Sequence, residues 1–284
     1  MYLGRFKMSI AINDALELEC FKNFKVIAGK QGLSNRIKKV GILDYEIKEL
    51  IEKNFVEGEF VLSTLINIKD NIKELYEIVE TLMVIGVSGL AIKPIYFDKI
   101  PDDVTELANR NGFPIMIFSE TYFEDIITDV MAAIRAKEER ASLGLKIDNI
   151  LYSDLNKMMI KKLAYEINGN FREKNIIAFC KNRNVNKYGK AEPSPRTEYD
   201  KTLKKFNKII PYHEGYIIIN TFEDIDNSEV NEIIKRRLEA LGFNAKQYII
   251  GISSLHKKLD ELNDSIKESM YAFKHSKTYD EGIS

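Results

Sequence analysis

Three polar residues in the N-terminal half of the chain could together bind an anion: Ser63, Thr64 and Lys93. Ser63 and Thr64 close the apolar segment 59–63 and precede a predicted helix, where hydroxyl groups and free backbone N–H groups favour negative charge. Lys93 follows the apolar segment 87–92 and would add a positive point charge. The pattern predicts that a small anionic metabolite binds at these three residues.

A structural role for the same residues is the alternative. Ser63 and Thr64 would then cap the following helix with their side-chain oxygens, although Asn67 or Asp70 could be the cap instead. Lys93 would be a solvated loop lysine. Both interpretations stay open from the residues alone.

The predicted site needs a sheet whose strands end at one edge. Apolar residues at helical spacing over 68–85, and a proline-started segment from Pro101 to Gly112, predict helices between apolar strands. The strands are expected at 36–42, 59–63, 87–92 and 114–118. Connections of this length imply right-handed crossovers and a parallel sheet, with ligands beyond the carboxyl ends of the strands. Glu120, at the last of these ends, could instead pair with Lys93 and fill the site.

The remaining candidates for chemistry form no recognised set. Gly29 and Gly32 are too close together for a nucleoside-triphosphate loop and indicate a tight turn. The carboxylates of Asp44, Glu57 and Glu59 could be paired for acid–base chemistry. Such residues are more often turn and edge charges. The histidines share no ligand spacing: His213, His256 and His275. We therefore predict no catalytic residue, no metal site and no cofactor.

The composition is typical of a soluble, cytoplasmic, two-domain protein. The chain has 284 residues, of which 45% are hydrophobic. Lys and Arg number 42 against 43 Asp and Glu, so a net charge of −1 gives no global attraction to nucleic acid. No apolar run approaches the roughly 18 residues that a membrane helix needs. Cys20 and Cys180 have aromatic or apolar neighbours, which favours buried free thiols over a disulfide or a nucleophile.

Residues 119–170 are expected to form a helical connector. Two stripes of apolar residues at helical spacing lie on either side of Gly144: Phe123, Ile126, Ile127, Val130, Met131 and Ile134, then Ile147, Ile150, Leu151, Leu155, Met158, Met159 and Leu163. The stripes pack either on their own domains or against the same helices of a second copy. A homodimer of the second kind predicts these contact residues: Ile127, Val130, Ile134, Ile150 and Leu151.

Residues 171–284 are predicted to form an α+β domain. Strands are expected at 175–180, 209–212, 216–220 and 248–253, and helices at 196–208, 228–241 and 259–275. The middle two strands form a hairpin around His213 and Glu214. The resulting order β-α-β-β-α-β is the ferredoxin-like arrangement.

An ordered series of short motifs between Ala28 and Phe118 resembles the N-terminal domain of the PucR family, the purine-catabolism-regulator type of bacterial transcription factor. The motifs are Ala28-Gly29-Lys30-Gln31-Gly32-Leu33, Glu57-Gly58-Glu59-Phe60-Val61-Leu62-Ser63-Thr64, Gly86-Val87-Ser88-Gly89-Leu90-Ala91-Ile92-Lys93-Pro94, Ile100-Pro101 and Gly112-Phe113-Pro114. The resemblance covers roughly residues 9–134 and implies an α/β sensor domain over 9–118.

The stretch Ile249–Ser253, with the residues that follow it, resembles the GGDEF-like domain that succeeds the sensor domain in PucR and CdaR-type regulators; the resemblance covers about residues 148–279. Diguanylate cyclases of that kind carry two glycines and an acidic pair on the central hairpin, which admit a guanine nucleotide and hold Mg²⁺. This chain has Pro211-Tyr212-His213-Glu214-Gly215 there. The resemblance therefore implies a degenerate GGDEF-like domain that neither makes nor tightly binds cyclic di-GMP.

Together the two resemblances imply the ligand-sensing and dimerising region of a PucR-type regulator of purine or related small-metabolite catabolism. The implied partners are a small effector such as a purine-derived compound, a second copy of the chain, and no membrane. In this family DNA is bound through a C-terminal helix-turn-helix domain; because the chain stops at Ser284, we expect that domain to be absent and the chain alone not to bind DNA specifically. The alternatives are an enzyme acting on a small anionic metabolite at the strand ends, or an interaction module without a ligand.

Overall fold

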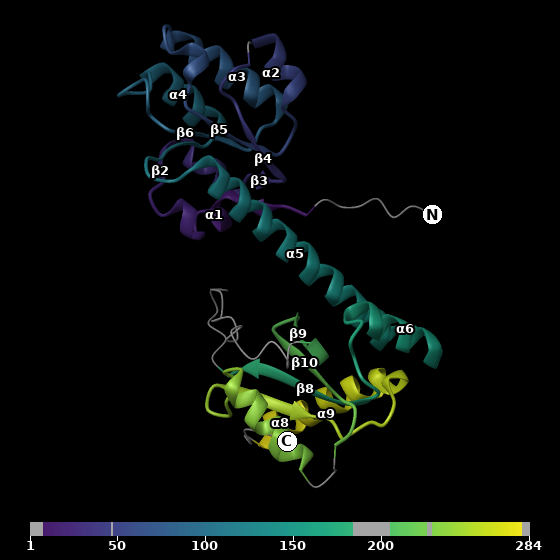
Figure 1. Ribbon diagram of the computed structural model, residues 1–284. Helices are drawn as coiled ribbons and strands as arrows, with labels where there is room; N and C mark the ends of the chain where they lie inside the picture. Colours follow the sequence, from purple (N-terminus) through teal and green to yellow (C-terminus); the bar gives the residue numbers. More distant parts are fainter. Residues whose placement is uncertain (1–7, 47, 184–204, 226–228, 280–284) are drawn as a thin grey trace. The chain divides into compact units, whose positions relative to one another are not determined.

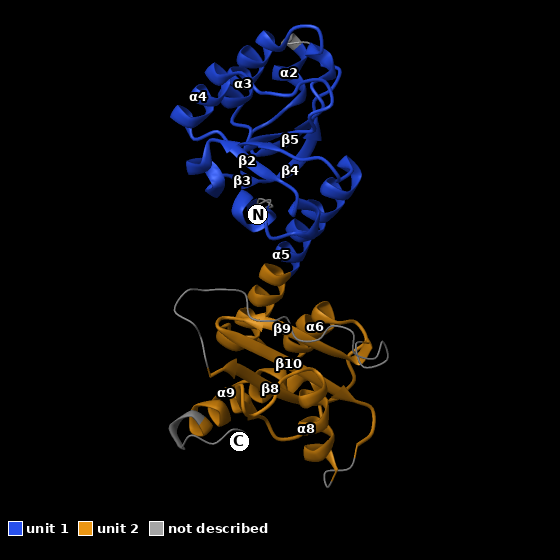
Figure 2. Cartoon of the chain, turned by 90° about the vertical axis from the view of Figure 1, so that its left-hand side faces the viewer, with its two compact units in different colours: residues 1–139 blue, residues 140–284 orange. Residues whose placement is uncertain are grey.

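The computed structural model describes residues 8–46, 48–183, 205–225 and 229–279 (Figure 1). Its contacts divide the chain into two compact units, Met1–Glu139 (unit 1) and Arg140–Ser284 (unit 2), which Figure 2 colours separately. The boundary falls inside the predicted connector, whose extent at 119–170 stays a prediction. Within the described ranges, every helix is too short or too polar to cross a lipid bilayer.

Unit 1 is built on a mixed sheet of five strands in the order β2-β7-β6-β5-β4. Four strands are parallel to one another, as the sequence predicts: β4 (Lys39–Ile42), β5 (Glu59–Ser63), β6 (Gly89–Ile92) and β7 (Ile115–Ile117). β2 (Lys25–Ala28), which pairs antiparallel with β7, was not predicted. The predicted strand at 36–42 is divided: β3 (Arg36–Ile37) leaves the sheet and pairs with β1 (Ile10–Ala11).

Both faces of this sheet are buried, which explains why its central strands are apolar throughout. Helices cover one face, and a short helix with the beginning of a long one covers the other (Figure 1): α2 (Lys48–Asn54), α3 (Leu75–Ile85) and α4 (Asp102–Asn111), then α1 (Ile12–Ala15) and α5 (Phe123–Tyr152). Along β5 the side chains alternate: Val61 packs in the first layer, whereas Phe60 and Leu62 pack in the second.

Glycine and proline set the helix ends as predicted. Gly86 follows α3 with φ 84° and Gly112 follows α4 with φ 59°, a left-handed conformation that glycine adopts without strain. Pro101 directly precedes α4. The predicted start of α3 at residue 68 is wrong, because the chain first makes separate 3₁₀ turns. The 3₁₀ turns of unit 1 are η1 (Glu19–Phe21), η2 (Lys30–Ser34), η3 (Ile66–Ile68) and η4 (Ile72–Glu74).

The apolar stripes of α5 are covered by the unit to which each belongs. Val130 and Ile134 are buried in the core of unit 1, and Ile127 packs against that core. Ile150 and Leu151 are buried in the core of unit 2. Four of the five predicted dimer contacts are therefore inside a single copy of the chain, which favours the alternative that the stripes pack on their own domains. Dimerisation itself stays a prediction.

A charge placed in either stripe is expected to unfold the protein rather than separate two copies. Ile134→Glu and Leu151→Glu should each lower the free energy of unfolding by about 3–5 kcal/mol, because a carboxylate would be buried without a partner. Leu145→Glu on the same helix is the control; its side chain is 65% exposed, so a change within about 0.5 kcal/mol is expected. Urea denaturation gives stability and sedimentation gives mass. Stable variants of reduced mass would restore the stripes as a dimer interface.

Unit 2 contains a four-stranded antiparallel sheet in the order β11-β8-β10-β9. Its strands are β8 (Lys174–Asn182), β9 (Asn207–Tyr212), β10 (Gly215–Phe222) and β11 (Tyr248–Ile252). The predicted strands and hairpin are confirmed. The predicted helix at 196–208 lies largely outside the described residues, and its last two positions belong to β9.

Helices also cover both faces of the second sheet. α8 (Val230–Ala240) packs on the face that carries Ile176 and Ala178. The end of α5 packs on the opposite face, which carries Ile177 and Phe179, together with three further elements: α6 (Lys157–Ile167), η5 (Leu259–Glu261) and α9 (Leu262–Tyr279). Alternation along β8 thus divides the unit into two cores, as it does along β5 in unit 1.

Candidate functional site

The three residues predicted to bind an anion do lie at the carboxyl edge of the first sheet. The parallel register sets Ser63 beside Ile92. The Lys93 amide then donates to the Ser63 carbonyl at 2.8 Å. The chain therefore brings Ser63, Thr64 and Lys93 together in space, as the strand order predicts.

At this edge, however, the carboxylate of Asp44 occupies the hydrogen-bond donors. Asp44 Oδ1 accepts from the Thr64 amide at 2.7 Å and from Thr64 Oγ1 at 2.9 Å, and it lies 3.3 Å from Ser63 Oγ. Ser63 is fully buried, and its hydroxyl also donates to the Leu43 carbonyl while accepting from the Leu65 amide. The protein's own anion thus takes the place that a ligand would need. The available signal was an aspartate two residues after the end of β4, the neighbour of β5.

The prediction of a helix directly after Thr64 is wrong. Leu65 is left-handed, with φ 60°, and the following η3 has three residues, too short to collect helix dipoles. Lys93 Nζ donates to the Thr121 carbonyl at 3.1 Å and lies 5.3 Å from the centre of the Tyr122 ring. Glu120 accepts from the Asn23 side chain at 3.0 Å. Ligand binding at Ser63, Thr64 and Lys93 stays a prediction, with its donors already engaged.

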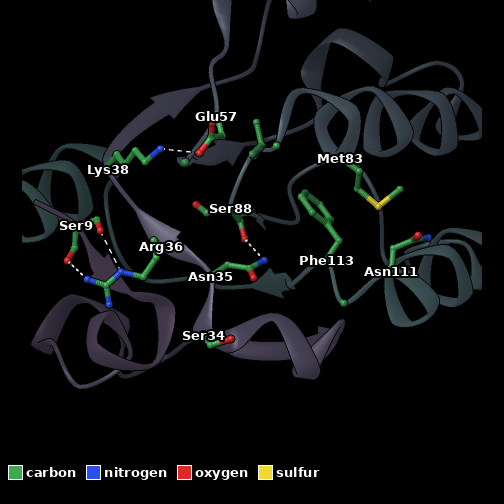
Figure 3. A pocket seen from close by; sticks show the side chains of 14 residues that line it. Ser9, Ser34, Asn35, Arg36, Lys38, Glu57, Met83, Ser88, Asn111 and Phe113 are labelled. Atoms are coloured by element: carbon green, nitrogen blue, oxygen red, sulfur yellow. Dashed lines mark hydrogen bonds and ion pairs between the residues drawn. The ribbon is translucent and has the colours of Figure 1, made fainter. Parts of the chain in front are cut away.

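A pocket of about 650 Å³ lies at the opposite edge of the same sheet, where the parallel strands begin (Figure 3). We call it the amino-edge pocket. Its volume falls in the range of small-molecule sites. It is lined by Ser9, Ser34, Asn35, Arg36, Lys38, Glu57, Gly58, Met83, Gly86, Val87, Ser88, Asn111, Gly112 and Phe113.

Short turns before each parallel strand build the amino-edge pocket. Gly58, Gly86 and Gly112 all have positive φ and stand just before β5, β6 and β7. The Gly58 amide donates to the Gly86 carbonyl at 2.9 Å, and the Lys38 amide donates to the Gly58 carbonyl at 2.7 Å. A Cβ on Gly32 would lie 1.9 Å from the Gly112 carbonyl oxygen, so the backbones touch there. The walls are therefore fixed mainly by backbone contacts.

Polar side chains of the pocket are held in two groups. Asn35 donates to the Ser88 carbonyl at 3.1 Å, and the buried Ser88 hydroxyl donates to the Glu59 carbonyl at 2.8 Å. Lys38 Nζ lies 2.7 Å from Glu57 Oε1, and this hydrogen bond and charge hold the pKa of Glu57 below its usual value. Figure 3 shows both contacts as dashed lines, from Asn35 to Ser88 and from Lys38 to Glu57.

Arg36 lies beside the first group and faces the pocket with an exposed side chain. Its Nε donates to the Ser9 hydroxyl at 3.0 Å, and Nη2 donates to the Ser9 carbonyl. This site was not predicted from the sequence, because ligands were expected at the carboxyl ends of the strands. A signal was present: Gly58, Gly86 and Gly112 of the quoted motifs each precede a parallel strand, so their turns must meet at the amino edge.

Other residues considered for chemistry are engaged elsewhere. Glu59 pairs with Lys39 at 3.0 Å and accepts from the Val56 amide at 3.1 Å. Burial, and then a hydrogen bond to Asp129, raises the pKa of the Cys20 thiol to about 12, and burial also raises the pKa of the Cys180 thiol, so neither favours a thiolate. Across the described ranges, no three side chains of His, Cys, Asp or Glu gather where a metal ion could be held.

In unit 2, the hairpin at the place of the cyclase signature has its acidic residue paired. β9 ends at Tyr212, and β10 begins at Gly215. Glu214, between them, forms an ion pair with Lys181 of β8. The expectation that this unit neither makes nor tightly binds cyclic di-GMP stays a prediction.

Comparison with known proteins gives matches to unit 1. Residues 14–134 match the family described as purine catabolism regulatory protein-like. A segment of 111 residues is 32% identical to the purine catabolism regulatory protein of Bacillus subtilis (strain 168), covering 38% of this chain and 20% of that protein. The match thus spans about a fifth of the length of this curated relative. The family match over residues 14–134 contains thirteen of the fourteen residues that line the amino-edge pocket, all but Ser9.

Proposed function

Because this chain belongs to the purine catabolism regulatory protein-like family through residues 14–134, we propose that it is the effector-sensing region of a bacterial transcription regulator. Unit 1 is the sensor, and its effector is a small metabolite of purine breakdown or of a related catabolic route. The observation that carries the proposal is the family match, which encloses the whole parallel part of the first sheet and nearly all of the amino-edge pocket.

The regulator works by population shift. An effector that binds one conformation of unit 1 more tightly than another moves the equilibrium by the difference in binding free energy, and by no more. The response is passed to DNA through a homodimer and a helix-turn-helix domain, and units 1 and 2 do not themselves contact DNA. The near balance of charge, −1 over the chain, supports this division of roles because DNA binding calls for a basic surface.

A thermal-shift screen of the full chain against purine catabolites, organic acids and nucleotides tests the proposal. A true effector at about 100 times its dissociation constant should stabilise the protein by about 2.7 kcal/mol, which raises the midpoint by several degrees. Mass spectrometry of the same samples shows whether the compound is left unchanged. A compound that is converted rather than bound would favour the enzyme alternative, and a screen without any shift would contradict effector sensing.

A further inference from the structure

Resting on the proposed function of unit 1 as a sensor, we propose that the amino-edge pocket is the effector site and that its ligand is a small monoanion with a flat or apolar body. The recognising groups are Arg36 and Lys38 on one side and Met83, Val87 and Phe113 on the other.

The charge of the lining sets the charge of the ligand. Three of the lining residues are ionised at neutral pH: Arg36 and Lys38 carry one positive charge each, and Glu57 carries one negative charge, which leaves a net charge of +1. One carboxylate or comparable anion would neutralise the site. A dianion would leave a net charge of −1 in the site, and a neutral ligand would leave the charge of +1 without a partner.

Arg36 has donors to offer. Of the five N–H groups on its guanidinium, two are directed to Ser9 within the described chain. The remaining donors form part of the planar fork that matches a carboxylate. The side chain is exposed, so the anion need not displace a buried partner.

Lys38 can join Arg36 at low cost. Its present partner, Glu57, is 75% exposed, and ion pairs between exposed side chains contribute little to stability because water screens them. An incoming anion can therefore take the ammonium group while Glu57 turns to water. Glu57 then acts as a competitor for the ligand's charge, which provides a test in which a substitution strengthens binding.

The opposite wall suits an uncharged body. Figure 3 shows Phe113, Met83 and Asn111 on the side away from Arg36 and Lys38. Phe113 and Val87 are largely buried, so their exposed atoms form a fixed floor, whereas half-buried Met83 can adapt to shape. Two of the lining glycines leave room for the charged side chains: a Cβ on Gly58 would lie 2.7 Å from Lys38 Cδ, and one on Gly86 would lie 3.0 Å from Glu57 Cγ.

Matched acid and amide probes test the ligand class on the full ¹⁵N-labelled chain. Nicotinate and benzoate are flat monoanions, and nicotinamide and benzamide have nearly the same shape without the charge. Amide chemical shifts should move in the segments 34–38, 86–88 and 111–113 with the acids. The amides should bind at least tenfold more weakly, about 1.4 kcal/mol. Equal binding of acid and amide, or shifts elsewhere in the chain, would overturn the proposal, as would no shift with any probe.

Three substitutions locate the site. Arg36→Met keeps the stem and removes the charge, and should weaken the acids at least tenfold. Glu57→Gln removes the competing charge, and should tighten them at least threefold. Lys93→Met at the carboxyl edge should leave affinity unchanged; a tenfold loss there would instead support the site predicted from sequence at Ser63, Thr64 and Lys93. The thermal midpoint of each variant checks that the fold is kept.

The two proposals fail in different ways. If a compound from the thermal-shift screen stabilises the chain but Arg36→Met does not weaken it, the amino-edge pocket is wrong and effector sensing stands. If the acid probes respond to Arg36→Met and Glu57→Gln while the screen finds no effector, the pocket stands and the sensory function fails.

Discussion

Gly29→Ala is expected to destabilise unit 1 by about 3 kcal/mol or more. A Cβ at this position would lie 1.9 Å from the Phe113 carbonyl oxygen and 2.7 Å from the Pro114 nitrogen. These are backbone atoms at the entrance to β7, so they cannot turn aside as a side chain would. Overpacking costs about 1–3 kcal/mol, and the left-handed φ of 66° adds about 1–2 kcal/mol for a residue with a Cβ.

The control for this change is Gly144→Ala. No atom lies within 4 Å of a Cβ there, and Gly144 is inside α5. Alanine should therefore stabilise the protein by about 0.5–1 kcal/mol. Urea denaturation followed by amide signals from each unit separates the two effects. A Gly29→Ala protein within about 0.5 kcal/mol of the wild type would show that Gly29 and Phe113 are not packed as described.

Asp44→Ala is expected to lower the free energy of unfolding by about 2–4 kcal/mol. The change removes the acceptor of two donors on Thr64, its amide and its hydroxyl, and hydrogen bonds to a charged group contribute about 1.5–3 kcal/mol each without being additive. Asp70→Ala is the matched control, because Asp70 is an exposed aspartate of the same unit. There a change within about 0.5 kcal/mol is expected.

Chemical rescue sharpens the Asp44 experiment. Acetate or formate at tens of millimolar should raise the thermal midpoint of Asp44→Ala by more than that of the wild type, since a free carboxylate can enter the place left by the side chain. The wild type, whose donors are already engaged, should respond only to the general effect of salt. An unchanged midpoint for Asp44→Ala without any added anion would contradict the assigned contacts.

Three of the parallel strands of unit 1, β5, β6 and β7, could be predicted because each is a short apolar run with a glycine or proline close to its start. The turns at Gly86 and Gly112 followed from the same residues. The antiparallel strand β2 could not be predicted in this way, because Lys25–Ala28 is an edge strand whose pairing with β7 depends on residues about ninety positions away. The start of α3 was predicted too early because the apolar residues before Leu75 belong to two separate 3₁₀ turns, η3 and η4, and their spacing resembles that of an α-helix.

The candidate site was predictable in position more than in chemistry. Strand order alone placed Ser63, Thr64 and Lys93 at one edge. Asp44, which follows the end of the neighbouring strand, meets the donors of Thr64, and periodicity along one segment carries no information about that neighbour. The amino-edge pocket required the converse step, from glycines scattered over the motifs to the turns that they form side by side.

The pairing of β2 with β7 also bears on how the protein is made. Val26 lies opposite Met116, so the first strand of the main sheet to leave the ribosome has no partner until about ninety further residues have been synthesised. At typical elongation rates of about 5–20 residues per second, this delay is about 5–20 s. During that time residues 25–33 present an unpaired strand and a glycine turn to the cell. An unpaired strand of this kind can associate with other chains before β7 is available. The stability of the folded protein therefore says little about how safely the nascent chain folds.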